Sequence, residues 1–226
     1  MAVITSLDRE LYHVSLAAAY LRVPPATLKY WLEGGSRKGF SYEPVIRERK
    51  TGSQNLTWGE FVEAWYVKQY RKVHGVEMLE IRTLIEGMRK EFGLRYPLAH
   101  RKAYVAAGKT LARKLQDEGL VSEKTSGVVR ERDGQLALSP IAEQFLAEVD
   151  FDSSEFVTQI LPAGESSPVR IEPDVAFGAP HVRGIRTENL AELVAAGEEI
   201  GSIADSFSLE ASELRAALAY EWQATA

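Results

Sequence analysis

The chain has no cysteine among its 226 residues, which excludes disulfides and thiolate metal sites. No apolar run approaches the length that spans a bilayer. The opening stretch MAVITSLDRELYH also lacks a basic segment that leads into an apolar one. We therefore expect a cytoplasmic protein that does not bind a membrane.

Histidine is scarce, and its positions do not form a catalytic or metal-binding pattern. Isolated histidines usually fill surface or core positions, and the chain contains no Gly-x-Ser-x-Gly nucleophile motif. These absences argue against an enzyme, a metal site and a bound cofactor. The four histidines lie far apart, at His13, His74, His100 and His181.

One stretch, AYVAAGKT at Ala103 to Thr110, satisfies a relaxed P-loop pattern. A working P-loop needs a buried strand before the loop and glycines that let the backbone wrap a phosphate. The preceding EFGLRYPLAHRK has no apolar run, and YVAA inside the motif favours a helix. We expect a turn at Gly108 that leads into a helix, rather than a nucleotide site.

Charge is divided unequally along the chain, although the net charge is only −5. Residues 1–132 hold 23 Lys and Arg against 15 Asp and Glu, a net +8, and residues 133–226 hold 4 against 17, a net −13. Such asymmetry suggests that the first half faces a polyanion and the second half faces something else. On charge alone, the alternative is that both halves have ordinary solvated surfaces.

The segment YHVSLAAAYLRVPPATLKYWL predicts two short helices joined by a tight turn. Ser15 is a suitable N-cap for the first helix, and Pro25 suits the first turn of the second. This is the plan of a helix-turn-helix, in which the second helix enters the major groove of DNA. Thr27, Lys29 and Tyr30 lie off the apolar stripe of that helix and are positioned to face DNA.

A basic segment follows, GGSRKGFSYEPVIRERKTGSQNLTW, whose glycines, β-compatible Val45-Ile46 and TGSQN turn suggest a hairpin or wing. A basic ribbon beside a recognition helix clamps phosphates on both sides of a groove. The candidate DNA contacts are Arg22, Thr27, Lys29, Tyr30, Arg37, Lys38, Arg47, Arg49 and Lys50.

Two longer helices are expected next. Thr57 and Glu60 form a capping-box signature at the start of the first, which Gly75 ends. Apolar residues at helical spacing between Ile81 and Phe92 predict the second. Their aromatic residues share helical stripes and are interpreted as core rather than as a platform for stacking bases.

This order of elements resembles the MerR-type winged helix-turn-helix, in which a wing precedes a helix pair with a Gly-x-x-x-x-x-Ile-Arg turn, here Gly75 to Arg82. The resemblance covers about the first ninety residues. Effector-sensing MerR regulators continue into a long dimerising coiled coil and often carry metal-binding cysteines. This chain has neither feature, so metal sensing is not expected.

The acidic half contains a hairpin signal and three predicted helices. Apolar residues on both sides of Asp133-Gly134 predict a short β-hairpin. Pro, Gly and Ser around 163–168 indicate a boundary or an exposed connector. The three helices follow Arg186, and the last two meet at a tight turn near Ser208. Because Glu210, Glu213 and Glu221 dominate the last helix, protein contact is a better interpretation than DNA contact.

The end of the chain resembles a small antitoxin-associated domain of unknown function with the hallmark Gly-x-Pro-x-x-x-Gly-x-Arg. Here the hallmark residues are Gly178, Pro180, Gly184 and Arg186, before the helices. Together with the MerR-like part, the whole chain resembles VapB-type antitoxins of mycobacteria and related actinobacteria. The resemblance implies a repressor that binds its own operator DNA and neutralises a PIN-domain ribonuclease toxin.

A PIN nuclease holds Mg²⁺ or Mn²⁺ with clustered carboxylates, so an inhibitor can insert a cation into its cleft. Arg183 and Arg186 are the candidates for that insertion, although a purely structural role for them stays open. The expected toxin-binding residues are Arg183, Arg186, Gly178, Pro180 and Gly184.

The sequence thus predicts a mainly α protein: a MerR-like winged helix-turn-helix domain at 1–95, connecting helices and a β-hairpin at 96–165, and a three-helix domain at 166–226 that binds toxin or dimerises. A homodimer is expected, because inverted-repeat operators need two readers at fixed spacing. The main alternative is a stand-alone MerR-like regulator that responds to a small ligand, and a scaffold protein is the third reading. Which surface dimerises is left open.

Overall fold

The structure is a computed structural model that describes residues 6–37, 39–73, 75–126, 128–130 and 135–223. Helices predominate and the strands form small two-stranded sheets, so the chain is mainly α with mixed elements, as predicted in outline. Two compact units are present. Unit 1 comprises residues 1–146 and 151–157, and unit 2 comprises 147–150 and 158–226. The predicted three-part division into 1–95, 96–165 and 166–226 stays a prediction about functional parts.

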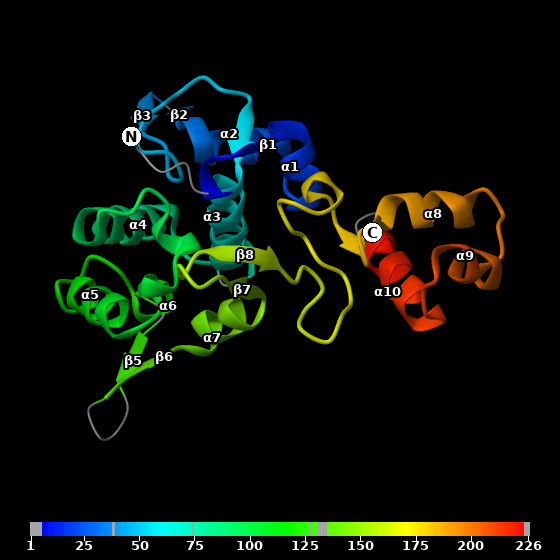
Figure 1. Ribbon diagram of the computed structural model, residues 1–226. Helices are drawn as coiled ribbons and strands as arrows, with labels where there is room; N and C mark the ends of the chain where they lie inside the picture. The colour runs from blue at the N-terminus through cyan, green and yellow to red at the C-terminus, as the bar shows by residue number, and fades with distance from the viewer. Residues whose placement is uncertain (1–5, 38, 74, 127, 131–134, 224–226) are drawn as a thin grey trace. The chain divides into compact units, whose positions relative to one another are not determined.

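Elements of the chain are labelled in Figure 1. The helices through residue 147 are α1 (Val14–Tyr20), α2 (Pro25–Glu33), α3 (Trp58–Lys68), α4 (Met78–Phe92), α5 (Ala106–Asp117), α6 (Glu123–Ser126) and α7 (Pro140–Ala147). The strands up to residue 160 are β1 (Glu10–His13), β2 (Gly35–Arg37), β3 (Phe40–Tyr42), β4 (Asn55–Thr57), β5 (Val128–Arg130), β6 (Leu136–Leu138), β7 (Val149–Phe151) and β8 (Val157–Ile160). Beyond them lie β9 (His181–Val182), β10 (Ile185–Arg186), α8 (Thr187–Ala195), α9 (Ile200–Phe207) and α10 (Ala211–Trp222).

Helices α1 and α2 are joined by a turn at residues 21–24, in which Arg22 has a positive φ of 53°. Pro25 opens α2, as the sequence predicted. The N-cap of α1 is His13 instead of Ser15: the Ser15 amide donates to His13 Nδ1 at 3.3 Å. The helix therefore begins two residues earlier than an N-cap at Ser15 would place it.

Helix α3 is the buried element of unit 1, with a run of buried residues from Trp58 to Val67. The predicted capping box is confirmed: the Thr57 side chain accepts from the Glu60 amide, and the Glu60 carboxylate accepts from the Thr57 amide. Trp58 Nε1 donates to Val157 O at 2.8 Å, which satisfies the indole inside the core. Aromatic rings from α3 pack against others in the core, which confirms their interpretation as core residues.

The strands around α2 differ in part from the prediction. β2 and β3 form an antiparallel hairpin, whereas β4 pairs with β1 near the N-terminus. Val45 and Ile46 were expected in a strand, but they lie in an irregular segment with both amides donating to Trp31 O, at 2.9 and 3.0 Å. Both side chains are buried. Burial against α2 outweighs their β-propensity, since that propensity mostly reflects fit to a sheet surface.

The P-loop-like stretch forms part of a helix. A 3-10 turn, Arg101–Ala103, precedes α5, and Gly108 lies in the first turns of that helix rather than before it. A Cβ at Gly108 would lie 2.0 Å from Ala103 O, so the glycine permits close backbone approach. Lys109 Nζ donates to Leu136 O at 2.8 Å. The predicted helix is confirmed, but the turn expected at Gly108 is wrong because that residue lies inside α5.

The predicted hairpin in the middle of the chain is present. Val128 pairs with Leu138 and Arg130 with Leu136 in an antiparallel ladder between β5 and β6. The expected turn at Asp133-Gly134 lies outside the described residues. Gly75, which the sequence placed at the end of the long helix, has φ +67° and follows the π-helical turn Gln69–Val73 after α3.

Unit 2 has a core of its own, built by α8, α9 and α10 against β9. Leu190 from α8, Ile203 from α9 and Leu214 from α10 are essentially fully buried there. The turn between α9 and α10 is made at Ser208, which adopts a left-handed conformation at φ 54°. The three helices and the tight turn at Ser208 match the predicted arrangement.

Candidate DNA-binding and partner-binding surfaces

The outer face of α2 borders an open groove in unit 1. Thr27, Tyr30 and Trp31 of α2 line the groove together with Arg71 and Lys72. Lys29 is exposed on the same helix, and Thr27 and Tyr30 are half-buried. The Tyr30 ring packs edge-on against Tyr42 of β3, with 6.2 Å between ring centroids, which fixes the hairpin against α2. The groove thus combines a helix face with two cations.

Arg71 and Lys72 were not among the predicted contacts. They lie in the π-helical turn after α3, where Arg71 Nη1 donates to Val76 O at 3.0 Å and Lys72 Nζ reaches Arg22 O at 3.4 Å. These bonds hold Lys72 next to the turn between α1 and α2. The signal in the sequence was the adjacent pair of cations just before Gly75. Helix α3 ends in this π-helical turn.

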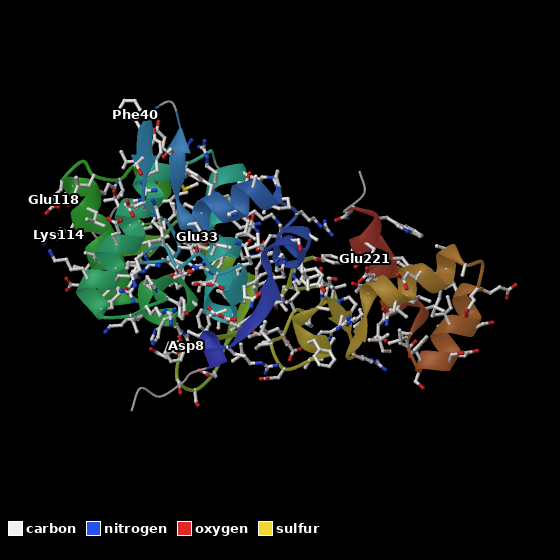
Figure 2. All side chains as sticks on the ribbon, turned by 90° about the horizontal axis from the view of Figure 1, so that it is seen from above. Asp8, Glu33, Phe40, Lys114, Glu118 and Glu221 are labelled. Atoms are coloured by element: carbon white, nitrogen blue, oxygen red, sulfur yellow. The ribbon has the colours of Figure 1, made fainter. Side chains whose placement is uncertain are left out.

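The β2–β3 hairpin lies where the sequence predicted a hairpin or wing. Phe40 lies at its end and is 68 % exposed, and Figure 2 shows it away from the rest of unit 1. Ser36 on β2 lines the groove beside α2. The side chain of Arg37 and the whole of Lys38, two predicted DNA contacts, lie outside the described part of the chain.

Arg47 is the clearest departure from the predicted site. Its side chain is 4 % exposed and forms ion pairs with Glu60, at 2.8 Å, and with Glu33. It also donates to Thr51 Oγ1 at 2.7 Å, Ser53 O at 3.1 Å and Asn55 O at 2.7 Å. Since every nitrogen of the guanidinium has an internal partner, the DNA contact predicted for Arg47 is wrong for this structure.

The charges around Arg47 reinforce one another. Burial acts to lower the pKa of Arg47, but hydrogen bonds and charge from Glu60 and Glu33 outweigh burial and raise it. Burial acts to raise the pKa of Glu33, but hydrogen bonds from Gly52, Thr51 and Arg47 outweigh it and lower that pKa. Arg47 and Glu33 therefore stay ionised near neutral pH. The network fastens the loop after the wing to the end of α2 and the start of α3.

Arg49 and Lys50, next to Arg47 in sequence, point outward. Both are exposed, and Lys50 Nζ is 4.0 Å from Glu43 Oε1 in a solvent-exposed pair. Arg49 borders a hollow that Arg95 and Tyr96 also line. Exposed pairs of this kind are weak, so both cations are available to bind an anion.

Two arginines of α4 hold the same loop by hydrogen bonds to its backbone carbonyls, and one of them also forms an ion pair with α3. Arg82 donates to Glu43 O at 2.6 Å, and Arg89 donates to Ile46 O and to Glu63 Oε2, the latter at 3.0 Å. Glu63 is completely buried in α3 and also accepts from the Leu98 amide at 3.3 Å. Burial raises the pKa of Glu63 to about 7 against the opposing charge of Arg89. The loop carrying Arg49 and Lys50 is thus held in one position by buried polar contacts.

In unit 2 the predicted toxin-binding arginines lie around a tight hairpin. Arg183 and Gly184 both have positive φ, 49° and 83°, and connect β9 to β10 as a two-residue turn. Arg183 Nε donates to Glu213 Oε1 at 2.9 Å, and Nη1 donates to Ser208 O at 3.1 Å, although the side chain is 57 % exposed. Arg183 thus braces the turn between α9 and α10.

Gly178 and Pro180 are buried, so a direct toxin contact predicted for them is not supported by their positions. Pro180 O accepts from the Thr187 amide at 3.0 Å and from its hydroxyl at 3.2 Å, which ties the loop to the start of α8. Gly178 has φ +75°. These residues shape the loop, whereas Arg186 remains partly exposed and donates from Nε to Ala176 O at 3.2 Å.

His181 lies under the same hairpin and is buried. The Gly184 amide donates to its Nδ1 at 3.1 Å, which leaves Nε2 to carry the proton in the neutral ring. Nε2 lies 3.5 Å from Glu172 Oε1. Burial, aided by the charge of Arg170, lowers the pKa of His181. The histidine is therefore neutral near pH 7 and holds the turn that carries Arg183.

The described residues contain neither a metal-binding cluster nor a membrane-spanning helix. No group of three or more His, Asp or Glu side chains there is placed to hold a metal ion. No helix in that part of the chain is long and apolar enough to cross a membrane.

Comparison with known proteins places the chain among mycobacterial relatives. The family described as "Protein of unknown function (DUF433)" matches residues 169–220, the part that forms β9 to α10. "Uncharacterized protein Rv2308" from Mycobacterium tuberculosis is 30 % identical over 227 residues, which cover 97 % of this chain and 93 % of the relative. "Putative antitoxin VapB45" from the same organism is 27 % identical over 225 residues, covering 93 % of each.

A solved structure shares the fold. The crystal structure of Rv2018 from Mycobacterium tuberculosis superposes with a TM-score of 0.76 at 26 % sequence identity. The match covers 95 % of this chain and all of that one. The arrangement described above is therefore found along the full length of a related chain.

Proposed function

We propose that this chain, which belongs to the same family as Rv2308 and aligns with 93 % of that protein's length, is an antitoxin that neutralises a PIN-domain ribonuclease and represses its own operon. The observation that carries this proposal is the relative named "Putative antitoxin VapB45", which aligns over 93 % of both chains. An alignment over nearly the whole length means that both units are shared, rather than one common module.

The surface of unit 1 supports the DNA-binding part of the proposal. Helix α2 follows α1 after a short turn, exposes Lys29 and is flanked by a hairpin, which is the plan of a MerR-like winged helix-turn-helix. Arg71 and Lys72 border the groove beside α2, and Arg49 and Lys50 are exposed on the loop after the wing. Exposed cations near a recognition helix are suited to contact DNA phosphates.

The contacts inside unit 1 explain why such a surface can bind without rearranging. Arg47, Arg82 and Arg89 direct their charge inward and fix the loop, so that Arg49 and Lys50 are presented on a rigid support. Ordering a loop during binding costs free energy, and a preformed loop avoids that cost. We propose Lys29, Arg49, Lys50, Arg71 and Lys72 as phosphate contacts, with Thr27 and Tyr30 facing the bases.

Unit 2 supplies the toxin-binding part in this proposal. The acidic second half is unsuited to DNA, whereas its hairpin at Arg183-Gly184 offers exposed positive charge on a rigid turn. A nuclease that binds metal with carboxylates presents negative charge around its cleft, so an arginine-bearing loop suits that target. A homodimer is proposed as well, since an inverted-repeat operator requires two DNA-binding units.

Co-expression tests the proposal directly. The chain is produced with the PIN-domain nuclease encoded beside its gene, and the purified nuclease is assayed on RNA with and without the chain. Co-purification and loss of RNA cleavage are expected, together with binding of the chain to a duplex from its own promoter. If the nuclease cleaves RNA equally well with excess chain, the antitoxin assignment is wrong. Promoter binding that responds to a small ligand and ignores the nuclease would favour a stand-alone regulator.

A further inference from the structure

An unusual turn precedes the hairpin of unit 2. Ala176, Phe177 and Gly178 are three consecutive residues with positive φ, at 51°, 59° and 75°. This region favours glycine or asparagine, because a Cβ crowds the backbone there, and a bulky side chain is an outlier. A phenylalanine at the centre of such a turn is therefore held against its local preference.

Packing of the phenylalanine ring in the core does not offset this strain. Phe177 is 78 % exposed, and it has the largest exposed fraction among the large apolar side chains of the described residues. Exposed apolar surface of this size is costly in water. Neither the backbone conformation of Phe177 nor its exposed side chain stabilises the fold. A contact with another molecule therefore explains its position better.

The turn is held in place from its base. The Gly178 amide donates to Val175 O at 2.9 Å, and Arg186 Nε donates to Ala176 O at 3.2 Å. The Arg186 guanidinium lies 5.6 Å from the centroid of the Phe177 ring, in cation–π contact. Buried Pro180 anchors the chain that follows. The ring is therefore presented in a fixed orientation with a cation beside it.

We propose that Phe177 is the anchor residue by which unit 2 binds its protein partner, with its ring entering an apolar socket that has carboxylates at the rim. Aromatic residues and arginine dominate the binding energy of protein interfaces when they fill a desolvated pocket. Carboxylates are expected at the rim of the partner's socket because two arginines lie near the ring. Arg186 supports the ring and remains partly exposed, and Arg183 is exposed. In this role Arg186 positions the ring instead of entering the partner's metal site.

The partner is a different protein rather than a second copy. Residues 133–226 carry a net −13, so two such halves repel each other at long range. A nuclease with a carboxylate cluster has the complementary charge. The inference rests on the proposed function, because it takes the PIN-domain nuclease as the occupant of this surface.

The test replaces the ring while keeping the turn. Phe177→Asn removes the aromatic side chain and places there a residue that tolerates positive φ, and Phe177→Gly relieves the strain altogether. Binding of each full-length variant to the nuclease is measured by calorimetry, and melting temperature is measured alongside. We expect nuclease binding at least 20-fold weaker for both variants, with unchanged or higher melting temperatures. The matched control is Phe40→Asn, which removes an equally exposed ring from the β2–β3 hairpin and should leave nuclease affinity unchanged.

The outcomes separate the two proposals. If the unaltered chain binds the nuclease and both Phe177 variants bind it equally well, the anchor assignment is wrong and the antitoxin assignment stands. If the unaltered chain does not bind the nuclease, the antitoxin assignment fails and this inference fails with it. If the variants change the oligomeric state of the chain in sedimentation and not its nuclease affinity, the socket belongs to a second copy and the proposed partner is wrong.

Discussion

Arg47 Nε donates to Glu60 Oε1 at 2.8 Å, and each of these two side chains is only 4 % exposed. The pair joins the loop after the wing to the first turn of α3, where Glu60 also closes the capping box. The most densely basic stretch of the sequence therefore contains one cation that holds the fold and two neighbours that face outward. The predictions below separate these two uses of positive charge.

Replacing Arg47 should destabilise the protein strongly. In Arg47→Ala, Glu60 and Glu33 lose their shared partner and remain in a buried setting, which typically costs about 3–5 kcal/mol. Urea unfolding measures the change in the free energy of unfolding. Arg49→Ala, two residues away and exposed, is the control and should change stability by about 0.5 kcal/mol or less. Equal stability of the two variants would show that Arg47 is not the internal partner described here.

Replacing exposed cations should weaken DNA binding without affecting the fold. Lys29→Gln and Lys50→Gln are each expected to reduce promoter affinity and to lower the slope of log affinity against log salt by about 1, as for the loss of one phosphate contact. Fluorescence anisotropy at several salt concentrations gives both quantities. Lys114→Gln is the matched control, because Lys114 projects from α5 (Figure 2) and is not part of the groove beside α2. An equal loss in all three variants would contradict the proposed surface.

The cap of α3 makes a further prediction. Thr57→Ala removes the acceptor of the Glu60 amide and leaves Tyr96 Oη without its partner at 3.0 Å, so a loss of about 1–2 kcal/mol is expected. Thr57→Ser retains the hydroxyl and should recover most of that loss. Chemical denaturation of the two variants distinguishes the cap from simple loss of volume. A serine variant as unstable as the alanine variant would rule out the hydrogen bonds as the cause.

Glu63 should make stability depend on pH. Burial raises its pKa to about 7 in the folded protein from an ordinary value of 4.5, so the folded state binds a proton that the unfolded chain has released. The free energy of unfolding therefore falls as pH rises from 4.5 to 7, by up to about 3 kcal/mol from this group. Glu63→Gln should flatten this part of the pH profile. Glu86→Gln, on the exposed side of α4, should leave the profile unchanged, and an unaltered slope in Glu63→Gln would refute the assignment.

The turn between α9 and α10 offers a test in unit 2. Ser208 has φ 54°, where glycine is favoured, so Ser208→Gly should stabilise the protein by about 0.5–1 kcal/mol. Ser206→Gly, within α9, should have the opposite sign because glycine weakens a helix. Melting temperatures report both changes. Stabilisation by both substitutions, or by neither, would mean that backbone strain at Ser208 is not the controlling factor.

Several features were predictable because their causes are local. The capping box at Thr57 and Glu60 spans three residues, and the apolar spacing from Ile81 to Phe92 gives the buried side of α4 directly. The three helices of unit 2 were likewise indicated by the helical spacing of apolar residues and by the helix end at Gly197 and the turn at Ser208. In each case the residues that determine the structure lie within one or two turns of one another.

The candidate site was predicted only in part. The sequence indicated a basic cluster at 47–50, but it gave no means of telling Arg47 from Arg49, since the partners of Arg47 are 13 and 14 residues away. Arg71 and Lys72 were overlooked because they join the groove only when α3 is folded beside α2. The exposed ring of Phe177 depends on a left-handed turn that no periodicity or propensity indicates.

The amino-acid sequence by itself determined the positions of most helices, the opposed charges of the two halves and the general location of the basic surface. Only the tertiary structure decided which cations face water and where the segment at Val45-Ile46 packs. It also decided that Gly178 and Pro180 are buried inside a loop whose conformation they fix. The physical reason is the separation along the chain between the groups that interact. Capping, helical periodicity and net charge depend on neighbours along the chain, whereas burial and ion pairing depend on groups that folding alone brings together.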